Sequence, residues 1–268
     1  MIKCWRCKMN NVSSLPLLLK QLKLMTMLKL WEDHEQEAKN NNLSHAKYLQ
    51  LLVELEVNSR YSSKVKRHMR ESKLPSGKSI ATFNFTDIPS INKSQIDAFT
   101  ENTKWVNECH NILLFGASGL GKTHLACAIA YGAITQGIRV LFTKTTALVQ
   151  KLQEAKKGYC LPEAIAKLNK YQLLILDDIG YVKKDELETN VLFELIADRY
   201  ETGSIIITSN LAFSEWDKIF PDSMAAVAAI DRIVHHSTII NITGESYRKK
   251  NSQYKNTFEN GGKNVIKN

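Results

Sequence analysis

One run of eight residues has the composition and spacing of a phosphate-binding loop. Residues 116–123 read Gly-Ala-Ser-Gly-Leu-Gly-Lys-Thr and fit the pattern G-x-x-x-x-G-K-[ST]. The glycines let backbone amides encircle a β-phosphate, Lys122 brings a positive charge to the β- and γ-phosphates, and the Thr123 hydroxyl is a ligand for Mg²⁺. We therefore expect ATP and Mg²⁺ to bind at the loop formed by Gly116, Ala117, Ser118, Gly119, Leu120, Gly121, Lys122 and Thr123.

Two adjacent carboxylates end a short apolar run farther along the chain. Residues 173–176 read Leu-Leu-Ile-Leu and are followed by Asp177 and Asp178. A buried strand that delivers carboxylates at its carboxyl end is what a magnesium–phosphate site requires. We expect Asp177 to hold Mg²⁺ through water, and Asp178 to orient and deprotonate the attacking water. Two acids after a strand are by themselves a common turn, so this interpretation depends on the phosphate loop.

A third polar side chain follows another apolar run. Residues 205–209 read Ile-Ile-Ile-Thr-Ser and precede Asn210. In the NTPases that have an additional strand, this strand lies between the strand of the phosphate loop and the strand of the acids. In that topology Asn210 would lie beside the γ-phosphate and help to position the water. Outside it, an asparagine after a strand is an ordinary turn residue.

A parallel sheet would bring these three groups of residues to one edge. Helical stretches separate five short apolar segments, and buried strands that alternate with helices form parallel sheets covered on both faces. The sequence therefore predicts an α/β fold with a five-stranded parallel sheet. The expected strands are residues 111–115, 140–142, 173–176, 205–209 and 239–242.

The first quarter of the chain predicts a small all-helical domain over residues 15–75. Apolar residues recur at every fourth position from Leu49 to Met69, which places them along one face of a long helix, with Ser44 as its cap. Residues 74–77, Leu-Pro-Ser-Gly, end the helix and predict a linker. The remaining predicted parts are an amino-terminal extension (1–14), the α/β domain (76–248) and a polar, disordered tail (249–268).

Positive charge is concentrated at the amino-terminal end. The formal net charge is +9, and residues 1–80 hold 15 basic and 7 acidic side chains, whereas residues 81–268 hold 21 and 20. Such an asymmetry favours a polyanion as partner, nucleic acid before membrane. A solvated helix face is the alternative, and Lys183 and Lys184 are the alternative basic residues in the α/β domain. We expect double-stranded DNA to contact the basic run from Arg60 to Lys78, through Lys64, Lys66, Arg67 and Arg70.

Composition argues against several other classes of protein. Five cysteines, an odd number thinly spread, argue against a secreted disulfide scaffold. No apolar run approaches the roughly 18–20 residues that span a bilayer, which excludes a membrane protein. Lysines interrupt the leucine-rich stretch that could pass for a signal peptide, so we expect a cytoplasmic location. Cys4 and Cys7 form a C-x-x-C pair with no second pair, which argues against a zinc site.

From about Leu15 to Arg248 the chain resembles the IstB-like transposition helper ATPases, relatives of the DnaC-type helicase loaders in the AAA+ superfamily. Of the six matching stretches, the first three are common to AAA+ ATPases and the last three are specific to this family. The resemblance implies an AAA+ P-loop NTPase fold for the α/β domain. The matching stretches are 111–123, 173–181, 199–210, 213–216, 231–236 and 244–248.

The resemblance also implies a DNA-binding ATPase that assists an insertion-sequence transposase. In that family ATP promotes self-assembly on DNA, the assembly deforms and marks the target, and the transposase is recruited and stimulated there. Hydrolysis then resets the complex. The expected partners are double-stranded DNA, the cognate transposase and further copies of the chain in a homo-oligomer, with no membrane. The sequence shows no separate acidic triad of the kind that a nuclease needs.

Two arginines receive roles from the resemblance. Arg232 matches the arginine finger, which reaches across a subunit interface to a neighbour's γ-phosphate, and Arg248 matches the second sensor, which contacts phosphate within its own subunit. Arginine suits both roles because its planar, always-charged fork stabilises charge on phosphoryl oxygens. Arg199 is a rival for the finger, since it also precedes a strand. A surface ion pair is the alternative for each.

One residue departs from the usual AAA+ pattern, and the sequence leaves two alternative functions to consider. Many AAA+ proteins carry glutamate where this chain has the shorter Asp178, so we expect slow hydrolysis, which suits a switch better than a motor. A replicative helicase loader would use the same core, with its amino-terminal segment gripping a helicase. A small-molecule P-loop kinase is disfavoured by the Asn210 strand and by the absence of a lid-like arginine cluster late in the chain.

Overall fold

The computed structural model describes residues 14–180, 186–218 and 224–247. Several positions singled out from the sequence lie outside these described residues. They are the Cys4 and Cys7 pair, Lys183 and Lys184, Arg248, and the predicted tail over residues 249–268.

The chain divides into two compact units, Met1–Lys66 and Arg67–Asn268. The sequence placed the boundary after residue 75, whereas this division falls inside the long helix α3, His45–Ser72. The last turns of α3 belong to the second unit, and side chains of these turns form hydrogen bonds with other residues of that unit. Glu71, for example, accepts a hydrogen bond of 3.0 Å from Nε of Arg139.

The first unit is helical, as the sequence predicted. The helices α1, Leu15–Gln21, and α2, Met25–Asn40, pack with the first part of α3 around a small apolar core. The Tyr48 hydroxyl donates a hydrogen bond of 2.8 Å to the carbonyl of Trp31 and ties α3 to α2. The buried core residues are Leu19, Met27, Trp31 and Leu52.

A buried carboxylate from α3 caps α2. The N-cap position of α2 offers no side-chain acceptor, and Glu56, 5% exposed, accepts hydrogen bonds from the N–H groups of Thr26 (2.7 Å) and Met27 (3.2 Å). Arg60 donates from Nε to the same carboxylate at 2.7 Å and from Nη2 to the carbonyl of Lys23 at 2.7 Å. Arg60, the first residue of the predicted basic run, is thus part of the packing of the first unit.

The apolar row predicted along α3 lies on the helix, but its first four members are exposed. Leu49, Val53, Val57 and Tyr61 each expose more than two fifths of their surface. The helix instead packs through the neighbouring row that contains Leu52. Every-fourth spacing therefore predicted the helix correctly without identifying its buried face, because two apolar rows run along it.

The second unit is built on a five-stranded parallel sheet, which confirms the predicted fold class. The strand order is β2-β3-β4-β1-β5, so β4 lies between β1 and β3. Leu114 pairs with Thr208 and Leu176 with Ile207, so the carboxyl ends of these three strands reach the same edge. The strands are β1, Asn111–Phe115; β2, Val140–Lys144; β3, Leu173–Asp177; β4, Ser204–Ser209; and β5, Ser237–Asn241.

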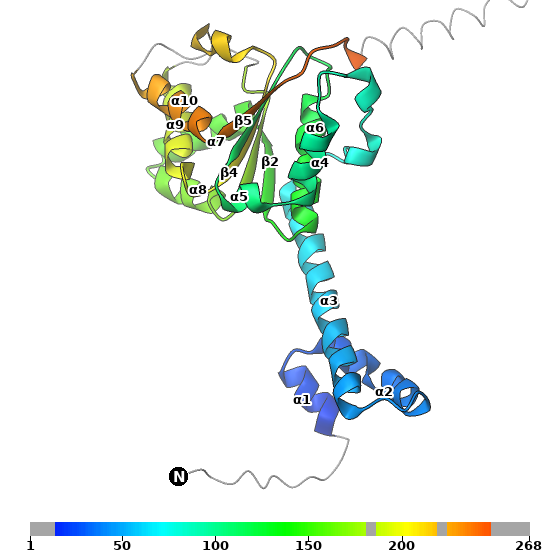
Figure 1. Ribbon diagram of the computed structural model, residues 1–268. Coiled ribbons are helices and arrows are strands. Elements are labelled where there is room, and N and C mark those ends of the chain that lie inside the picture. The colour runs from blue at the N-terminus through cyan, green and yellow to red at the C-terminus, as the bar shows by residue number, and fades with distance from the viewer. Residues whose placement is uncertain (1–13, 181–185, 219–223, 248–268) are drawn as a thin grey trace, which may run out of the picture. The chain divides into compact units, whose positions relative to one another are not determined.

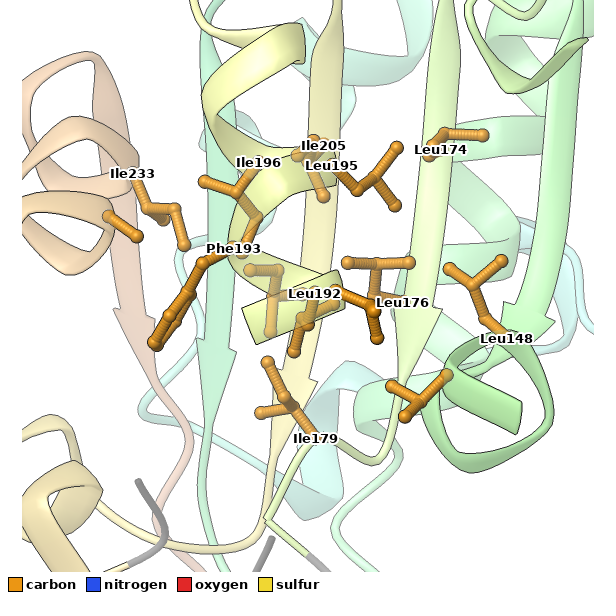
Figure 2. Close-up of a cluster of buried hydrophobic side chains, with 14 of the residues drawn as sticks. Leu148, Leu174, Leu176, Ile179, Leu192, Phe193, Leu195, Ile196, Ile205 and Ile233 are labelled. Atoms are coloured by element: carbon orange, nitrogen blue, oxygen red, sulfur yellow. The ribbon is translucent and has the colours of Figure 1, made fainter. Parts of the chain in front are cut away.

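Helices cover both faces of this sheet (Figure 1). α7, α8, α9 and α10 lie on one face, where their apolar side chains meet those of the strands, and α6 lies on the other face with α4 against it. Figure 2 shows the first of these layers, with Leu176 of β3 beside Leu192 of α9, and Leu174 of β3 nearer to Leu195. β1, β3 and β4 are buried throughout, which explains why they read as continuous apolar runs. The helices of this unit are α4, Lys93–Glu101; α5, Lys104–Asn107; α6, Lys122–Thr135; α7, Thr145–Lys157; α8, Leu161–Leu168; α9, Glu186–Arg199; and α10, Met224–His235.

The described residues of the second unit also form three short 3₁₀ helices. They are η2, Ile80–Thr82; η3, Phe85–Asp87; and η4, Phe213–Lys218. Within the part of the chain that the structure describes, no helix combines the length and the apolar character needed to cross a membrane.

Candidate functional site

The phosphate loop joins β1 to α6, at the carboxyl edge of the sheet. Gly121 occupies the N-cap of α6 with φ of +83°, and a Cβ there would lie 2.8 Å from Cε2 of Phe83. Gly116 has φ of +147°, and a Cβ there would collide with the carbonyl of Ile242. Both positions therefore need glycine. The N–H groups of the first turn of a helix lack partners within the helix and attract anions, so this loop is built for a phosphate.

Lys122, near the end of the phosphate loop, is buried. Its side chain is 8% exposed, and Nζ donates hydrogen bonds to the carbonyls of Gly116 at 2.7 Å and Ala117 at 2.9 Å. The ammonium group therefore lies across the loop, where the sequence predicted a positive charge for the phosphates.

The two predicted magnesium ligands are in direct contact. The Thr123 hydroxyl donates a hydrogen bond of 2.7 Å to Oδ1 of Asp177, the last residue of β3. Asp177 is 7% exposed. Among the described residues, no group of three or more His, Cys, Asp or Glu side chains could hold a metal ion. A Mg²⁺ ion here would thus complete its shell with phosphate oxygens and water, as it commonly does at nucleotide sites.

The next acid has an unusual backbone conformation. Asp178 has φ of +64°, in the left-handed region, which aspartate tolerates better than most residues. Its N–H donates a hydrogen bond of 2.8 Å to Oγ1 of Thr208, in β4. Asn210 follows β4, and its Oδ1 atom is buried with no hydrogen-bond partner among the residues described. Because buried polar atoms are nearly always satisfied, this oxygen marks a place for a water or a ligand.

One cavity of about 570 Å³ unites these residues. Its volume lies within the range of small-molecule and cofactor sites. The walls include residues 118–123 of the phosphate loop together with Asp178, Thr208 and Asn210. The structure thus brings the phosphate loop, the second acid and the asparagine to one place, as the parallel sheet required.

The opposite wall of this cavity comes from a segment that the sequence had assigned in part to a linker. Gly77, Lys78 and Phe83 line the cavity, together with Asn84, Asp87 and Ile88. His124, which directly follows the phosphate loop, holds the segment through Nε2, 2.9 Å from the carbonyl of Ser79 and 3.1 Å from Oγ1 of Thr82. No local pattern in the sequence indicated this contact. It also removes Lys78 from the predicted basic run and places it at the nucleotide cavity.

The family profile described as IstB-like ATP binding protein matches residues 17–255. The chain belongs to this family. A Sinorhizobium fredii protein that carries the name of an insertion-sequence ATP-binding protein is 46% identical over 89% of this chain and 80% of its own length. Relatives named for insertion sequences are 37% identical in Geobacillus stearothermophilus (85% of this chain, 90% of the relative) and 35% identical in Pseudomonas aeruginosa (88% and 89%). The resemblance found in the sequence is therefore confirmed.

Solved structures confirm the fold of this family member. The DnaC helicase loader is 21% identical, with a TM-score of 0.50 over 66% of this chain and 99% of the loader. AMPPCP-bound DnaA from Aquifex aeolicus is 21% identical, with a TM-score of 0.51 over 70% of this chain and 57% of DnaA. At these identities the comparison establishes the fold and nothing further.

Arg232 does not line the nucleotide cavity of its own chain. It is exposed on α10, in a small depression that it shares with Tyr200, His236 and Asn111. Asn111 begins β1, whereas the phosphate loop follows the end of β1, so Arg232 lies toward the amino edge of the sheet. Any contact of this side chain with a nucleotide would therefore be with one bound by another copy of the chain.

Arg199, the rival for the arginine finger, is buried and bonded through its Nη atoms inside its own chain, while its Nε atom has no hydrogen-bond partner among the described residues. The side chain is 2% exposed, and its Nη atoms donate to the carbonyls of Tyr171 (3.1 Å), Gln172 (3.1 Å) and Ser204 (3.0 Å). Burial lowers the pKa of the guanidinium to about 10. A group held this way joins the start of β4 to the segment before β3.

The four predicted DNA-contact residues are all exposed on α3. Lys64 and Lys66 end the first unit, and Arg67 and Arg70 begin the second. None of the four forms a hydrogen bond or an ion pair with the described residues. The buried His68 and Ser72 mark the packed side of the same helix end. These charges are thus available to a partner.

Proposed function

We propose that this protein is an ATP-hydrolysing helper of an insertion-sequence transposase and acts on double-stranded DNA. The observation that carries the proposal is the single cavity that gathers the phosphate loop, Asp178, Thr208 and Asn210. Membership of the IstB-like ATP binding family supports ATP as the nucleotide. Relatives named for insertion sequences support a role in transposition.

The residues present fit ATP with Mg²⁺. Lys122 and the first turn of α6 supply positive charge for the phosphates, while Thr123 and Asp177 offer the hydroxyl and carboxylate oxygens that Mg²⁺ prefers. The buried Oδ1 atom of Asn210 offers an acceptor to a water. When bound, Mg²⁺ neutralises charge on the phosphate oxygens.

In this proposal, two side chains at the cavity wall act on the attacking water. The Asp178 carboxylate accepts a proton from the attacking water, and Asn210 accepts a hydrogen bond from the same water and orients it. Lys122 stabilises charge on the phosphoryl oxygens. Because aspartate is one methylene shorter than glutamate, we expect a slow reaction that DNA or a protein partner stimulates.

Assembly of several copies would complete the site. Arg232 is exposed and remote from its own phosphate loop, which suits an arginine finger that acts on the neighbouring copy's γ-phosphate. Arg248, assigned as the second sensor, is outside the described residues but follows Tyr247, whose N–H bonds to the Gly119 carbonyl at 3.1 Å. The chain in this proposal forms a homo-oligomer with ATP and DNA.

DNA binding rests on the exposed charges of α3. Lys64, Lys66, Arg67 and Arg70 offer four cations without protein partners among the described residues, as phosphate contacts require. The ATP-bound assembly would then recruit the cognate transposase, and hydrolysis would release it. These steps take place on DNA in the cytoplasm.

A helicase loader is the second candidate function, favoured by the structural likeness to DnaC. The two functions share the ATPase core and differ in the protein partner. The insertion-sequence relatives, at 35–46% identity, favour the transposase.

The test uses the full-length chain with ATP, Mg²⁺, duplex DNA and the cognate transposase of this proposal. We expect phosphate release that DNA stimulates, and strand transfer by the transposase that increases when the protein and ATP are both present. Phosphate release without any effect on strand transfer, together with binding to the replicative helicase, would favour the loader. No phosphate release under any of these conditions would contradict the ATPase.

A further inference from the structure

Thr208, in β4, is hydrogen-bonded both to Asp177, the last residue of β3, and to Asp178, which follows it. Its hydroxyl donates a hydrogen bond of 2.7 Å to Oδ1 of Asp177 and accepts one of 2.8 Å from the N–H of Asp178. Its carbonyl accepts a further hydrogen bond of 3.0 Å from the N–H of Ile179. Thr208 is 1% exposed, so these bonds are shielded from competing water.

We propose that Thr208 is a positioning residue for hydrolysis, which fixes the Asp177 carboxylate by its side chain and the Asp178 backbone by the same hydroxyl. This inference rests on the proposed ATPase function. It assigns a role to a residue inside an isoleucine-rich strand, whereas the acids themselves follow from the sequence.

The backbone of Asp178 explains why such a link is needed. A non-glycine residue with φ of +64° relaxes unless its neighbours hold it. The bonds from the amides of Asp178 and Ile179 to Thr208 bracket this residue on both sides and fix the direction of its side chain. A carboxylate that must accept a proton from one particular water depends on that direction.

The link also orients the carboxylate of Asp177. Oδ1 of Asp177 accepts from two hydroxyls, those of Thr123 and Thr208, each at 2.7 Å. Side chains that hold a metal ligand in place in this way contribute strongly to metal affinity and activity. Thr208 would therefore act on Mg²⁺ binding and on the chemical step together, through one hydroxyl.

The decisive variant is Thr208→Val, which keeps the shape of the side chain and removes the hydroxyl. Thr208→Ala repeats the loss with a smaller side chain, and Thr208→Ser restores the hydroxyl. Ile206→Val is the matched control, because it is a small change to a fully buried side chain of the same strand that bonds to neither acid. We expect kcat for ATP to fall about 10–100-fold in Thr208→Val and Thr208→Ala, with little change in KM. We expect values near wild type in Thr208→Ser and Ile206→Val.

Two further readouts do not depend on turnover. The Mg²⁺ concentration needed for half-maximal binding of a fluorescent ATP analogue should rise by about 10-fold in Thr208→Val. Residue-resolved amide exchange, measured without nucleotide, should accelerate at Asp178, which loses its acceptor. The amide of Ile179 bonds to the Thr208 carbonyl, which the substitution keeps, and serves as the internal control.

The outcomes separate this inference from the proposed function. Equal losses in Thr208→Val and Ile206→Val, or a Thr208→Ser variant as slow as Thr208→Val, would overturn the positioning role and leave the ATPase intact. If the wild-type chain binds no nucleotide, the proposed function fails, and unchanged exchange at Asp178 in Thr208→Val would then overturn the positioning role as well.

Discussion

The hydroxyl of Thr123 lies 2.7 Å from Oδ1 of Asp177 and joins two residues that are 54 positions apart in the sequence. Thr123 lies in the first turn of α6 and Asp177 ends β3, and β4 separates β3 from the strand that leads to α6. The contact therefore depends on the order of the strands as well as on the two motifs. In the proposed function, this contact joins a residue of the phosphate loop to the strand that carries the acids.

Substitutions of Lys122 and Asp178 should impair different steps, ATP binding and ATP hydrolysis. Lys122→Ala removes the buried cation of the phosphate loop, so we expect loss of ATP binding and hence of hydrolysis. Asp178→Asn keeps the shape of the side chain but cannot accept a proton, so ATP should bind normally while kcat falls about 100–10,000-fold. Equilibrium binding of a fluorescent ATP analogue and single-turnover phosphate release measure the two steps. Equal loss of binding in both variants would show that Asp178 is misassigned.

Arg232 should act on a neighbouring copy. Arg232→Ala is expected to bind ATP normally and to hydrolyse it about 1,000–100,000-fold more slowly, the range for arginine fingers. Mixing it with Lys122→Ala should restore some activity, because one copy supplies an intact site and the other an intact finger. The measurement is phosphate release across mixing ratios, with assembly followed by light scattering. No recovery at any ratio in assembled samples would count against a shared site.

Arg199 should matter for stability instead. Arg199→Met leaves the carbonyls of Tyr171, Gln172 and Ser204 without their donor, and we expect the free energy of unfolding to fall by about 2–4 kcal/mol. Arg232→Met is the matched control, since an exposed arginine should change stability by only about 0.5 kcal/mol. Urea titrations followed by circular dichroism give both values. A stable Arg199→Met variant whose activity returned on mixing with Lys122→Ala would make Arg199 the finger.

Glu56 should make the first unit sensitive to acid. Burial alone would raise the pKa of Glu56, but hydrogen bonds from Arg60 and from the N–H groups of Met27 and Thr26 outweigh it and lower the pKa below 4.5. The folded state then binds the proton less readily than the unfolded state. The stabilisation is fully present above pH 4.5 and is lost as the pH falls through the lowered pKa.

Glu56→Gln tests this linkage. We expect it to lower the free energy of unfolding by about 1–3 kcal/mol at pH 7, because Gln offers no charge to Arg60 and to the amides of α2. The difference between variant and wild type should shrink below pH 4.5. Urea titrations at both pH values measure it, with amide exchange in α2 as the local readout. A difference that did not depend on pH would refute the assigned role of the charge.

The charges on α3 should set the salt dependence of DNA binding. Each phosphate contact adds roughly 0.9 to the slope of log affinity against log salt on duplex DNA. Neutralising Lys64, Arg67 and Arg70 to Gln should therefore reduce this slope by about 2–3 and weaken binding for all sequences alike. Fluorescence anisotropy of labelled duplexes across a salt series measures it.

Three exposed lysines outside α3 provide a control variant that loses the same number of positive charges. Lys151, Lys157 and Lys167 are exposed on α7 and α8, and their replacement by Gln removes the same number of charges. We expect this control to keep the wild-type slope. If it lost as much as the α3 variant, or if the α3 variant kept the full slope, the DNA surface would lie outside α3, on the α/β part of the second unit.

The phosphate loop and the acids could be read directly from the sequence. Both are local patterns: residues 116–123 carry their glycines at fixed positions, and Asp177 and Asp178 end an apolar run. Three of the five strands, β1, β3 and β4, could be predicted for a related reason, since they are buried throughout. A strand that is buried on both faces is apolar at every position, and Leu173–Asp177 was recognisable without knowing its neighbours.

Other features depend on which segments pack together, and only the tertiary structure decided them. Thr208 reads as an ordinary strand residue until the order β3-β4-β1 places its hydroxyl between two acids. From the sequence, Arg199 was an alternative candidate for the arginine finger, because its position before a strand does not show whether its side chain is exposed or buried. In the structure its guanidinium donates hydrogen bonds to backbone carbonyls of its own chain. The exposed row from Leu49 to Tyr61 has the same periodicity as a buried one. Periodicity and spacing report what one segment can bury or bind, whereas burial and hydrogen bonding are settled by the segment that meets it.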